Sequence, residues 1–237
     1  MMQVTAHIPS REGATPVIYN GSIWLVGGKH LAPNETKGGT LLTRIALTSN
    51  GAPDFTDFLM TDKYTFQYMS VVAYEGYLIC FGGCTSKGVG NDSTYIFNMH
   101  KNEWAVFQGP SISNSFGDKL SLADTPVMDD WHCRTICSEG GGFKCTVHQN
   151  IIYAAIVHRD ALIVWHFDMR NLSNEGTTHK WVKHSIHHER GKCLEYALTT
   201  AFIGSDGHLW FVSSLYKFCF EMLTPPDGSV SLRLLSP

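Results

Sequence analysis

Apolar residues along the chain are gathered in short runs that are separated by turns rich in Gly, Asn and Asp. Two of these runs, VIYNGSIWLVGG at 17–28 and VVAYEGYLICFGG at 71–83, share a central turn and a closing pair of glycines. Val, Ile, Phe, Trp and Tyr dominate the runs, which is typical of strands. No window shows the i, i+3, i+4, i+7 spacing of a capped amphipathic helix. The pattern therefore predicts an all-β chain in which helix is a minor component.

The same pattern occurs four times. The turns of the four copies lie at Gly21, Gly76, Asn150 and Gly207, so the first and last steps are similar and the middle step is longer. Each copy continues, after a polar loop, with a further apolar strand: LLTRIAL at 41–47, YIF at 95–97, LIVWHF at 162–167 and FCFEM at 218–222. A turn and a weaker strand follow. Each copy is thus expected to form four strands joined by turns.

Four-stranded units that repeat at about 50 residues are typical of β-propeller blades, because a lone blade cannot bury both of its faces. We expect a single propeller domain over 1–237, with blades at approximately 14–62, 66–107, 144–186 and 195–237. The long middle step is explained by an inserted loop at 108–143, which is rich in Ser, Gly, Asp and Pro. A degenerate fifth blade spread over part of this segment is the alternative.

The second copy resembles the kelch repeat. It contains ICFGG at 79–83, then Phe97-Asn98, and then Trp104. The first copy has LVGG without the later Trp. The third has Phe167-Asp168 and Trp181 without the glycine pair, and the fourth keeps only the strands. The resemblance is close over 71–107 and loose elsewhere.

The glycine pair of the first two copies has a physical explanation. We expect these positions to need backbone angles that a side chain forbids, or a close approach to the neighbouring blade.

What the resemblance implies is a non-enzymatic scaffold that binds a protein partner through inter-strand loops and the 108–143 insertion, since kelch-like propellers mostly serve as interaction platforms. Contact surfaces favour aromatic and basic groups at loop positions. On that basis the candidate partner-binding residues are Lys29, His30, Lys87, Trp131, His132, His158 and Arg159.

Both ends of the chain offer a fourth strand. GSVSLRLLSP at the carboxyl end suits the last copy, while QVTAHIPSREGA at the amino end resembles WVKHSIHHERGK at the end of the third copy. Two interpretations stay open. The chain is part of a larger propeller assembly, or one terminal strand extends a sheet, as propellers commonly remove open edges in this way.

Charge and hydropathy indicate which partners to expect. The net charge is −3, and no long basic cluster is present, so the electrostatic signature of nucleic-acid binding is missing. The longest clean apolar run, IIYAAIV at 151–157, is too short to cross a bilayer. We therefore expect a protein partner, no nucleic acid and no membrane insertion.

The seven cysteines are an odd number, and no signal-peptide pattern is present at the amino terminus. We expect free thiols and a cytoplasmic protein. Asn-X-Ser/Thr triplets at Asn20, Asn34, Asn91 and Asn171 keep secretion as an alternative.

Candidate metal and catalytic motifs are incomplete. Cys133 and Cys137, with His132 and His148 nearby, lack the second pair of a structural zinc site. The segment KHSIHHER at 183–190 is interpreted as a solvated inter-blade loop, and His166 as a hydrogen-bonded residue within a strand. No metal, cofactor or catalytic residue is expected.

A glycan-binding or glycosidase-like propeller is the second functional class. Asp129 and Asp130 are adjacent, whereas glycoside hydrolysis needs two carboxyl groups from separate elements. The sialidase repeat Ser-x-Asp-x-Gly-x-Thr-Trp is absent, and SDGHLW at 205–210 is only a shortened form of it. Sugar binding by surface Trp and Tyr remains the alternative to the protein scaffold.

Overall fold

A computed structural model of the chain describes residues 11–30, 39–85, 90–91, 93–108, 143–158, 161–170, 172, 180–187, 198–213, 217–223 and 230–236. In this part of the chain all regular structure is β-strand, and no helix occurs. The chain divides into two compact units, Met1–Val106 and Phe107–Pro237, which we call unit 1 and unit 2.

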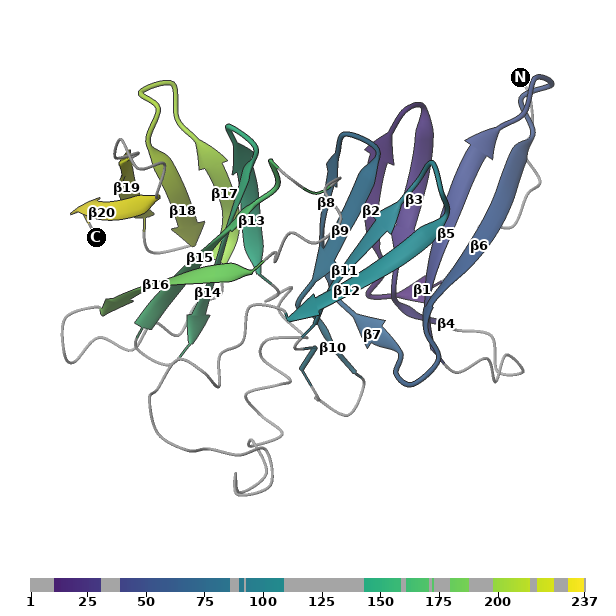
Figure 1. The fold of residues 1–237 in the computed structure, drawn as a ribbon, viewed down its shortest axis with the longest axis horizontal. Helices are drawn as coiled ribbons and strands as arrows, with labels where there is room; N and C mark the ends of the chain where they lie inside the picture. The colour runs from purple at the N-terminus through teal and green to yellow at the C-terminus, as the bar shows by residue number, and fades with distance from the viewer. Residues whose placement is uncertain are drawn as a thin grey trace. The chain divides into compact units, whose positions relative to one another are not determined.

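Unit 1 contains two four-stranded antiparallel sheets, each with its strands in chain order (Figure 1). Sheet 1 consists of β2 (Thr15–Tyr19), β3 (Ser22–Val26), β5 (Thr40–Leu47) and β6 (Pro53–Thr61). Sheet 2 consists of β8 (Ser70–Tyr74), β9 (Tyr77–Phe81), β11 (Ser93–Asn98) and β12 (Glu103–Gln108). Each sheet therefore takes its strands from one contiguous stretch of sequence.

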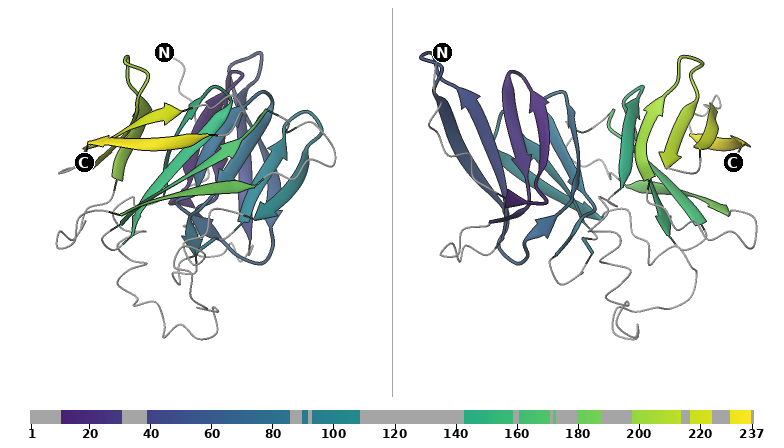
Figure 2. Two further views of the ribbon diagram at one scale, coloured as in Figure 1. Left: turned by 60° about the vertical axis from the view of Figure 1, so that its left-hand side comes forward. Right: turned by 180° about the vertical axis from the view of Figure 1, so that it is seen from behind.

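Unit 2 repeats this arrangement with two further sheets, seen from a second direction in Figure 2. Sheet 3 consists of β13 (Lys144–His148), β14 (Ile151–His158), β15 (Ala161–Asp168) and β16 (Trp181–His187). Sheet 4 consists of β17 (Leu198–Ile203), β18 (Leu209–Ser213), β19 (Lys217–Leu223) and β20 (Ser231–Ser236). The expected all-β fold built from four-stranded, blade-like sheets is confirmed.

Two short ribbons accompany the sheets of unit 1. β1 (Arg11–Glu12) pairs with β4 (Lys29–His30), and β7 (Phe66–Gln67) pairs with β10 (Cys84–Thr85). In sequence, β7 lies as far after β1, and β10 as far after β4, as Gly76 lies after Gly21. The sequence repeat therefore extends to the backbone pairing outside the main strands.

Backbone angles follow the same offset. Asn20 and Glu75 have φ of 46° and 43°, and Gly27 and Gly82 have φ of 65° and 64°. These angles lie in the left-handed region, which glycine adopts without the steric cost of a side chain. A Cβ on Gly27 would also stand 2.6 Å from the carbonyl oxygen of Phe66, at the entry to sheet 2. Both expectations for the glycine pair are thus confirmed at Gly27.

The sheets of unit 1 pack face to face through opposite surfaces. In sheet 1, we call the face that carries Trp24 and Val26 the leading face. In each other sheet, the leading face is the one that carries the counterparts of these two residues in the repeat. The opposite face of each sheet is its trailing face. The leading face of sheet 1 packs on the trailing face of sheet 2, where Leu78 and Cys80 lie. The rings of Trp24 and Phe97 meet at 5.9 Å across this contact.

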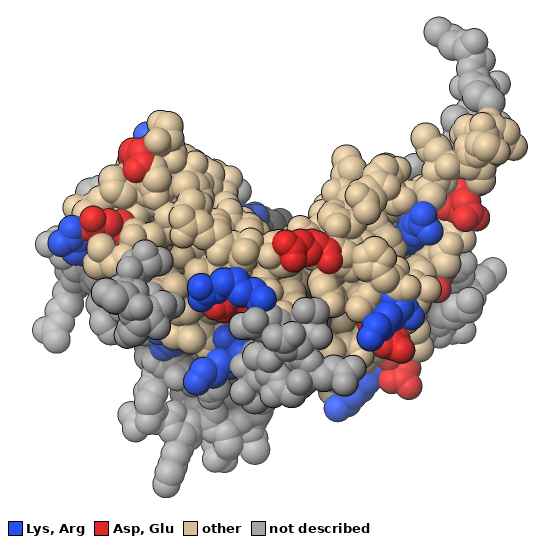
Figure 3. Space-filling view, turned by 45° about the horizontal axis from the view of Figure 1, so that its top comes forward, with Lys and Arg blue, Asp and Glu red and all other residues tan. Residues whose placement is uncertain are grey.

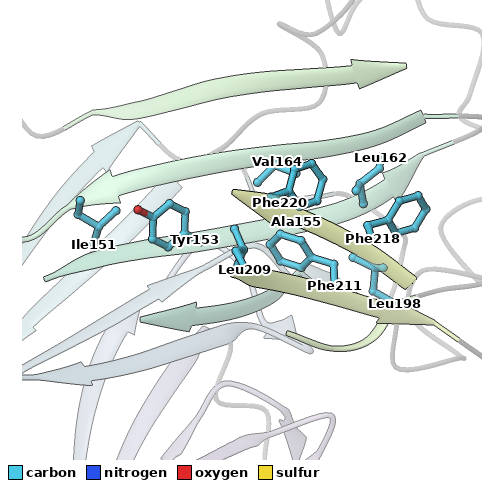
Figure 4. Close-up of a cluster of buried hydrophobic side chains, with 10 residues drawn as sticks. All are labelled: Ile151, Tyr153, Ala155, Leu162, Val164, Leu198, Leu209, Phe211, Phe218 and Phe220. Atoms are coloured by element: carbon cyan, nitrogen blue, oxygen red, sulfur yellow. The ribbon is translucent and has the colours of Figure 1, made fainter. Parts of the chain in front are cut away.

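Unit 2 uses the same two faces. Tyr153 and Ala155 lie on the leading face of sheet 3 and pack on Leu209 and Phe211, which lie on the trailing face of sheet 4 (Figure 4). The complete cluster of buried residues is Ile151, Tyr153, Ala155, Leu162, Val164, Leu198, Leu209, Phe211, Phe218 and Phe220. One rule of packing, leading face on trailing face, therefore holds within both units.

The two ends of the chain behave differently. β20 supplies the fourth strand of sheet 4, as GSVSLRLLSP at 228–237 suggested. At the amino end, Arg11 and Glu12 form the short ribbon with β4 and do not join a four-stranded sheet, while residues 1–10 lie outside the described part of the chain.

Candidate functional site

The candidate partner-binding residues fall largely on one connection of the repeat, the segment between the second and third strands of a sheet. Lys29 and His30 lie in this connection of sheet 1 on β4, and His158 ends β14 just before the corresponding hairpin of sheet 3. Of these three, only the side chain of Lys29 is described, and it is exposed. Lys87, Trp131, His132 and Arg159, like the bulk of the 108–143 insertion, lie outside the described residues.

Lys29 is held on a rigid support. It pairs with Glu12 in the β1·β4 ribbon, directly after the glycine pair. The N–H of Gly28 donates to the carbonyl oxygen of Phe66 at 2.8 Å, so the backbone before Lys29 is tied to the entry of sheet 2. A side chain on such a support has its Cα fixed before any partner arrives, which lowers the ordering cost of binding.

Arg11 anchors the other strand of the ribbon. Its Nη1 donates to the carbonyl oxygen of Leu41 at 3.0 Å, and its Nη2 donates to the carbonyl oxygen of Leu25 at 3.2 Å and to Thr43 Oγ1 at 2.7 Å. Thr43 Oγ1 in turn donates to Asp57 at 2.5 Å. Burial lowers the pKa of Arg11, an effect that the negative charge of Asp57 opposes. The guanidinium fork therefore joins the ribbon to β3 and β5, a task that suits its several fixed donors.

The matching ribbon of sheet 2 presents different chemistry. Its Cys84 occupies the place of Lys29, is buried and takes part in a disulfide. The expectation of free thiols holds for Cys80, Cys145 and Cys219, and fails at Cys84. Burial raises the pKa of Cys80, and it raises that of Cys145 to about 11, so both thiols stay protonated and unreactive near neutral pH.

A pair of histidines lies on sheet 3. Nδ1 of His166, on β15, is 2.7 Å from Nε2 of His184, on β16. Burial and, to a smaller extent, the neighbouring His184 lower the pKa of His166 to about 4, and burial lowers the pKa of His184 too. The expected role of His166 as a hydrogen-bonded strand residue is confirmed.

The interpretation of 183–190 as an inter-blade loop is wrong for residues 183–187. Trp181–His187 forms β16, the fourth strand of sheet 3, and pairs along β15. A strand at the edge of a sheet tolerates polar side chains, so the polarity of KHSIH did not exclude a strand.

Sugar binding requires exposed aromatic faces. Trp24 and Trp165 are buried, and Trp104, Trp181 and Trp210 are half-buried, so no Trp in the described part of the chain is fully exposed. Within the same residues no group of three metal-ligating side chains is assembled. The described tryptophans thus serve packing, as Phe167 and Trp181 do at 5.1 Å between ring centroids.

One of the four glycosylation triplets is used by the fold. Asn91 is buried, and its Nδ2 donates to the carbonyl oxygens of Gly82 and Ser93 at 2.9 Å. Its Oδ1 accepts from the N–H of Ser93 at 3.1 Å. An amide with these contacts fixes the connection after the glycine pair and is not available to a glycosyltransferase.

The surface carries mixed charge. On the face shown in Figure 3, the described Lys and Arg side chains and the Asp and Glu side chains form small groups that leave wide uncharged areas between them. Within the described residues, no helix is long and apolar enough to cross a membrane.

Sequence reasoning missed Arg11, Asn91 and Cys84 as structural residues of this region. Arg11 was one of seven scattered arginines, and nothing in its immediate neighbours marks it. The offset between the first two copies also relates Arg11–Glu12 to Phe66–Gln67, but the two pairs have no residue in common, so the sequence repeat gave no signal for the ribbon.

A family model matches part of the chain. Residues 66–109, which include sheet 2, match the family model described as the kelch motif. The chain therefore contains a kelch motif, at the copy where the sequence resemblance is closest. No curated protein matches the chain.

Proposed function

We propose that the chain is a non-enzymatic scaffold that binds a protein partner through the connections between its blade-like sheets. The kelch motif at 66–109 carries this proposal, because domains with this motif commonly mediate protein interactions. The four sheets and the 108–143 insertion are treated as parts of one propeller domain over 1–237. The residues proposed to contact the partner are Lys29, His30, Lys87, Trp131, His132, His158 and Arg159.

The geometry around Lys29 supports this assignment. Its ribbon is held by Arg11 on one side and by the bond from Gly28 to Phe66 on the other. Rigid sheets that present exposed connections are the usual arrangement for binding surfaces, because the scaffold fixes the ends of each loop. An exposed cation at such a place suits an acidic or aromatic group of a partner.

Charge reversal of Lys29 tests the proposal. Tagged wild-type chain and the variants K29E and K101E are used to capture proteins from native lysate, and retained proteins are quantified by mass spectrometry. Lys101 is the matched control, since it is an exposed lysine in the turn between β11 and β12, and its replacement by Glu changes the charge by the same amount. We expect K29E to capture at least about tenfold less of a stoichiometric partner than wild type does, and K101E to capture as much as wild type.

A further variant lacking 112–130 tests the insertion. Unchanged capture by this variant would remove the insertion from the proposal, and equal capture by K29E and K101E would remove Lys29. Retention of the chain on immobilised sugars, with no protein captured, would favour the glycan-binding alternative.

A further inference from the structure

Two sheet faces with apolar side chains are exposed. The trailing face of sheet 1 carries Ile18 and Ile23, which are 76% and 42% exposed. The leading face of sheet 4 carries Phe202 and Leu223, which are 43% and 36% exposed. Exposed apolar patches on soluble proteins commonly mark interaction sites.

The internal repeat shows what covers such a trailing face. Leu78 of sheet 2 is the counterpart of Ile23 in the repeat and is fully buried, because the leading face of sheet 1 lies on it. In unit 2 the trailing face of sheet 4 is likewise covered by the leading face of sheet 3. Each of these two covered trailing faces is therefore packed against a leading face. On the trailing face of sheet 1, Thr43 already binds Arg11 and Ile45 is buried, so the open part is the edge that carries Ile18 and Ile23.

Sheet 4 presents a leading face of the same design. Trp210 takes the place that Trp24 has in sheet 1, and Val212 takes the place of Val26. The ring of Trp210 stacks on that of Phe202, with 6.4 Å between centroids and 10° between planes. An ion pair between Arg233 and Glu221 borders these residues. An apolar centre with a charged margin is the usual composition of a protein interface.

We propose that two copies of the chain associate head to tail, with the leading face of sheet 4 in one copy packed on the trailing face of sheet 1 in the other. In unit 1, the ring of Trp24 contacts that of Phe97. Phe97 pairs with Leu78 in sheet 2 as Ile45 pairs with Ile23 in sheet 1, so Ile45 is the counterpart of Phe97. Trp210 of one copy therefore covers Ile23 of the other, beside Ile45, which is already buried within the chain. The contact repeats, between two chains, the packing that each unit already uses within one chain.

A second copy is the occupant that the faces favour, since one chain carries both complementary surfaces. The two surfaces differ, so the contact is heterologous. This inference does not depend on the partner proposed for the strand connections.

Mixing two singly defective variants provides the test. I18D places a charge on the trailing face of sheet 1, and F202D places one on the leading face of sheet 4. V106D is the control, because Val106 is 57% exposed on β12 and belongs to neither face. Molar mass is measured by sedimentation equilibrium over a range of concentrations, and near- and far-UV circular dichroism checks folding.

We expect wild type and V106D to reach at least twice the 26.4 kDa of one chain. I18D and F202D are each expected to stay monomeric, whereas their equimolar mixture associates, because each supplies the face that the other lacks. L223D replaces F202D in the mixture if F202D fails to fold. A monomeric wild type, which would also result if the chain covered its own faces, overturns the proposal. So does association of either single variant on its own, since that indicates contact between identical faces, and so does a mixture that stays monomeric.

Discussion

Unit 1 and unit 2 reach the same packing with different connections. In unit 1 the chain leaves sheet 1 at Gly27 and sheet 2 at Gly82, both at positive φ, and then forms a short ribbon. In unit 2 the corresponding strand of sheet 3 runs on to His158 and pairs with Ala161 across a tight hairpin. Ile156, which stands where the first glycine would be, pairs with Ile163 inside the sheet.

The difference separates the motif from the fold. Both units bury a leading face on a trailing face, through Trp24 and Leu78 in one and Tyr153 and Leu209 in the other. The glycine pair therefore has a local role. It turns the chain out of its own sheet and brings it against the next sheet. The apolar alternation of the strands, and not the glycines, is what makes each sheet a blade.

The largest effect is expected from removing the central ring of unit 1. Phe97 is fully buried and lies 4.8 Å from Phe58, 5.9 Å from Trp24 and 4.7 Å from Trp104 between ring centroids. F97A should cost about 3–5 kcal/mol of the free energy of unfolding, through lost burial and an unfilled cavity. Urea denaturation followed by Trp fluorescence measures this change.

The matched variant in unit 2 is F211A. Phe211 is equally buried, but its aromatic neighbour is the ring of Phe220 at 6.0 Å. We expect a smaller loss than for F97A. A larger loss for F211A would mean that ring contacts do not set the difference between the two clusters.

The next effect concerns the glycine that unit 2 lacks. G27A adds a Cβ 2.6 Å from the carbonyl oxygen of Phe66 in a backbone with φ of 65°. The clash and the left-handed angle together should cost about 2–4 kcal/mol. G21A is the control, because its φ of 69° is equally unusual but no described atom lies within 4 Å of the added Cβ. It should cost about 1 kcal/mol, and equal losses from both variants would show that the angle alone matters.

The sequence was informative where a local pattern has a local cause. Glycines at 27–28 and 82–83 demanded positive φ, and alternating apolar residues marked the strands, so the fold class followed. Residues whose role depends on distant parts of the chain gave no signal. Arg11 contacts Leu41 and Thr43, which lie far along the chain from it, and these contacts appear only after folding.

The candidate site was predictable only as a position in the repeat. Lys29 could be placed next to the glycine pair from sequence, but its pairing with Glu12 could not, because a two-residue strand has no pattern of its own. The histidines of 183–190 misled for a related reason. The polarity of His184 suggested a loop, yet its ring contacts that of His166 on the neighbouring strand. Only the register of β15 and β16 brings the two residues together.

Acid should distinguish unit 2 from unit 1. The pKa of His166 is lowered from 6.5 to about 4, so between these values the unfolded chain binds a proton that the folded chain does not. Stability is therefore expected to be full above pH 6.5 and to fall as the pH drops toward 4. The loss should be at least about 1 kcal/mol, since one unit of pKa corresponds to about 1.4 kcal/mol.

Urea midpoints at pH 7 and pH 5, together with NMR titration of the histidine ring protons, measure the effect of His166. H166Q keeps a polar side chain and removes the titration, so its midpoint should change less with pH than that of wild type. A His166 resonance that titrates near pH 6.5 would contradict the prediction.

The smallest effect is expected from a single polar contact between the sheets of unit 1. Thr15 Oγ1 donates to the carbonyl oxygen of Met69 at 2.6 Å, and Thr15 is half-buried beside the apolar cluster. T15V preserves the shape of the side chain and removes the donor, which should cost about 1 kcal/mol because the carbonyl of Met69 loses this partner. T48V removes an exposed hydroxyl that bonds within its own turn, to the carbonyl oxygen of Ala52 at 2.8 Å, and should cost less. If T15V were as harmless as T48V, the contact between sheet 1 and sheet 2 would depend on the apolar faces alone.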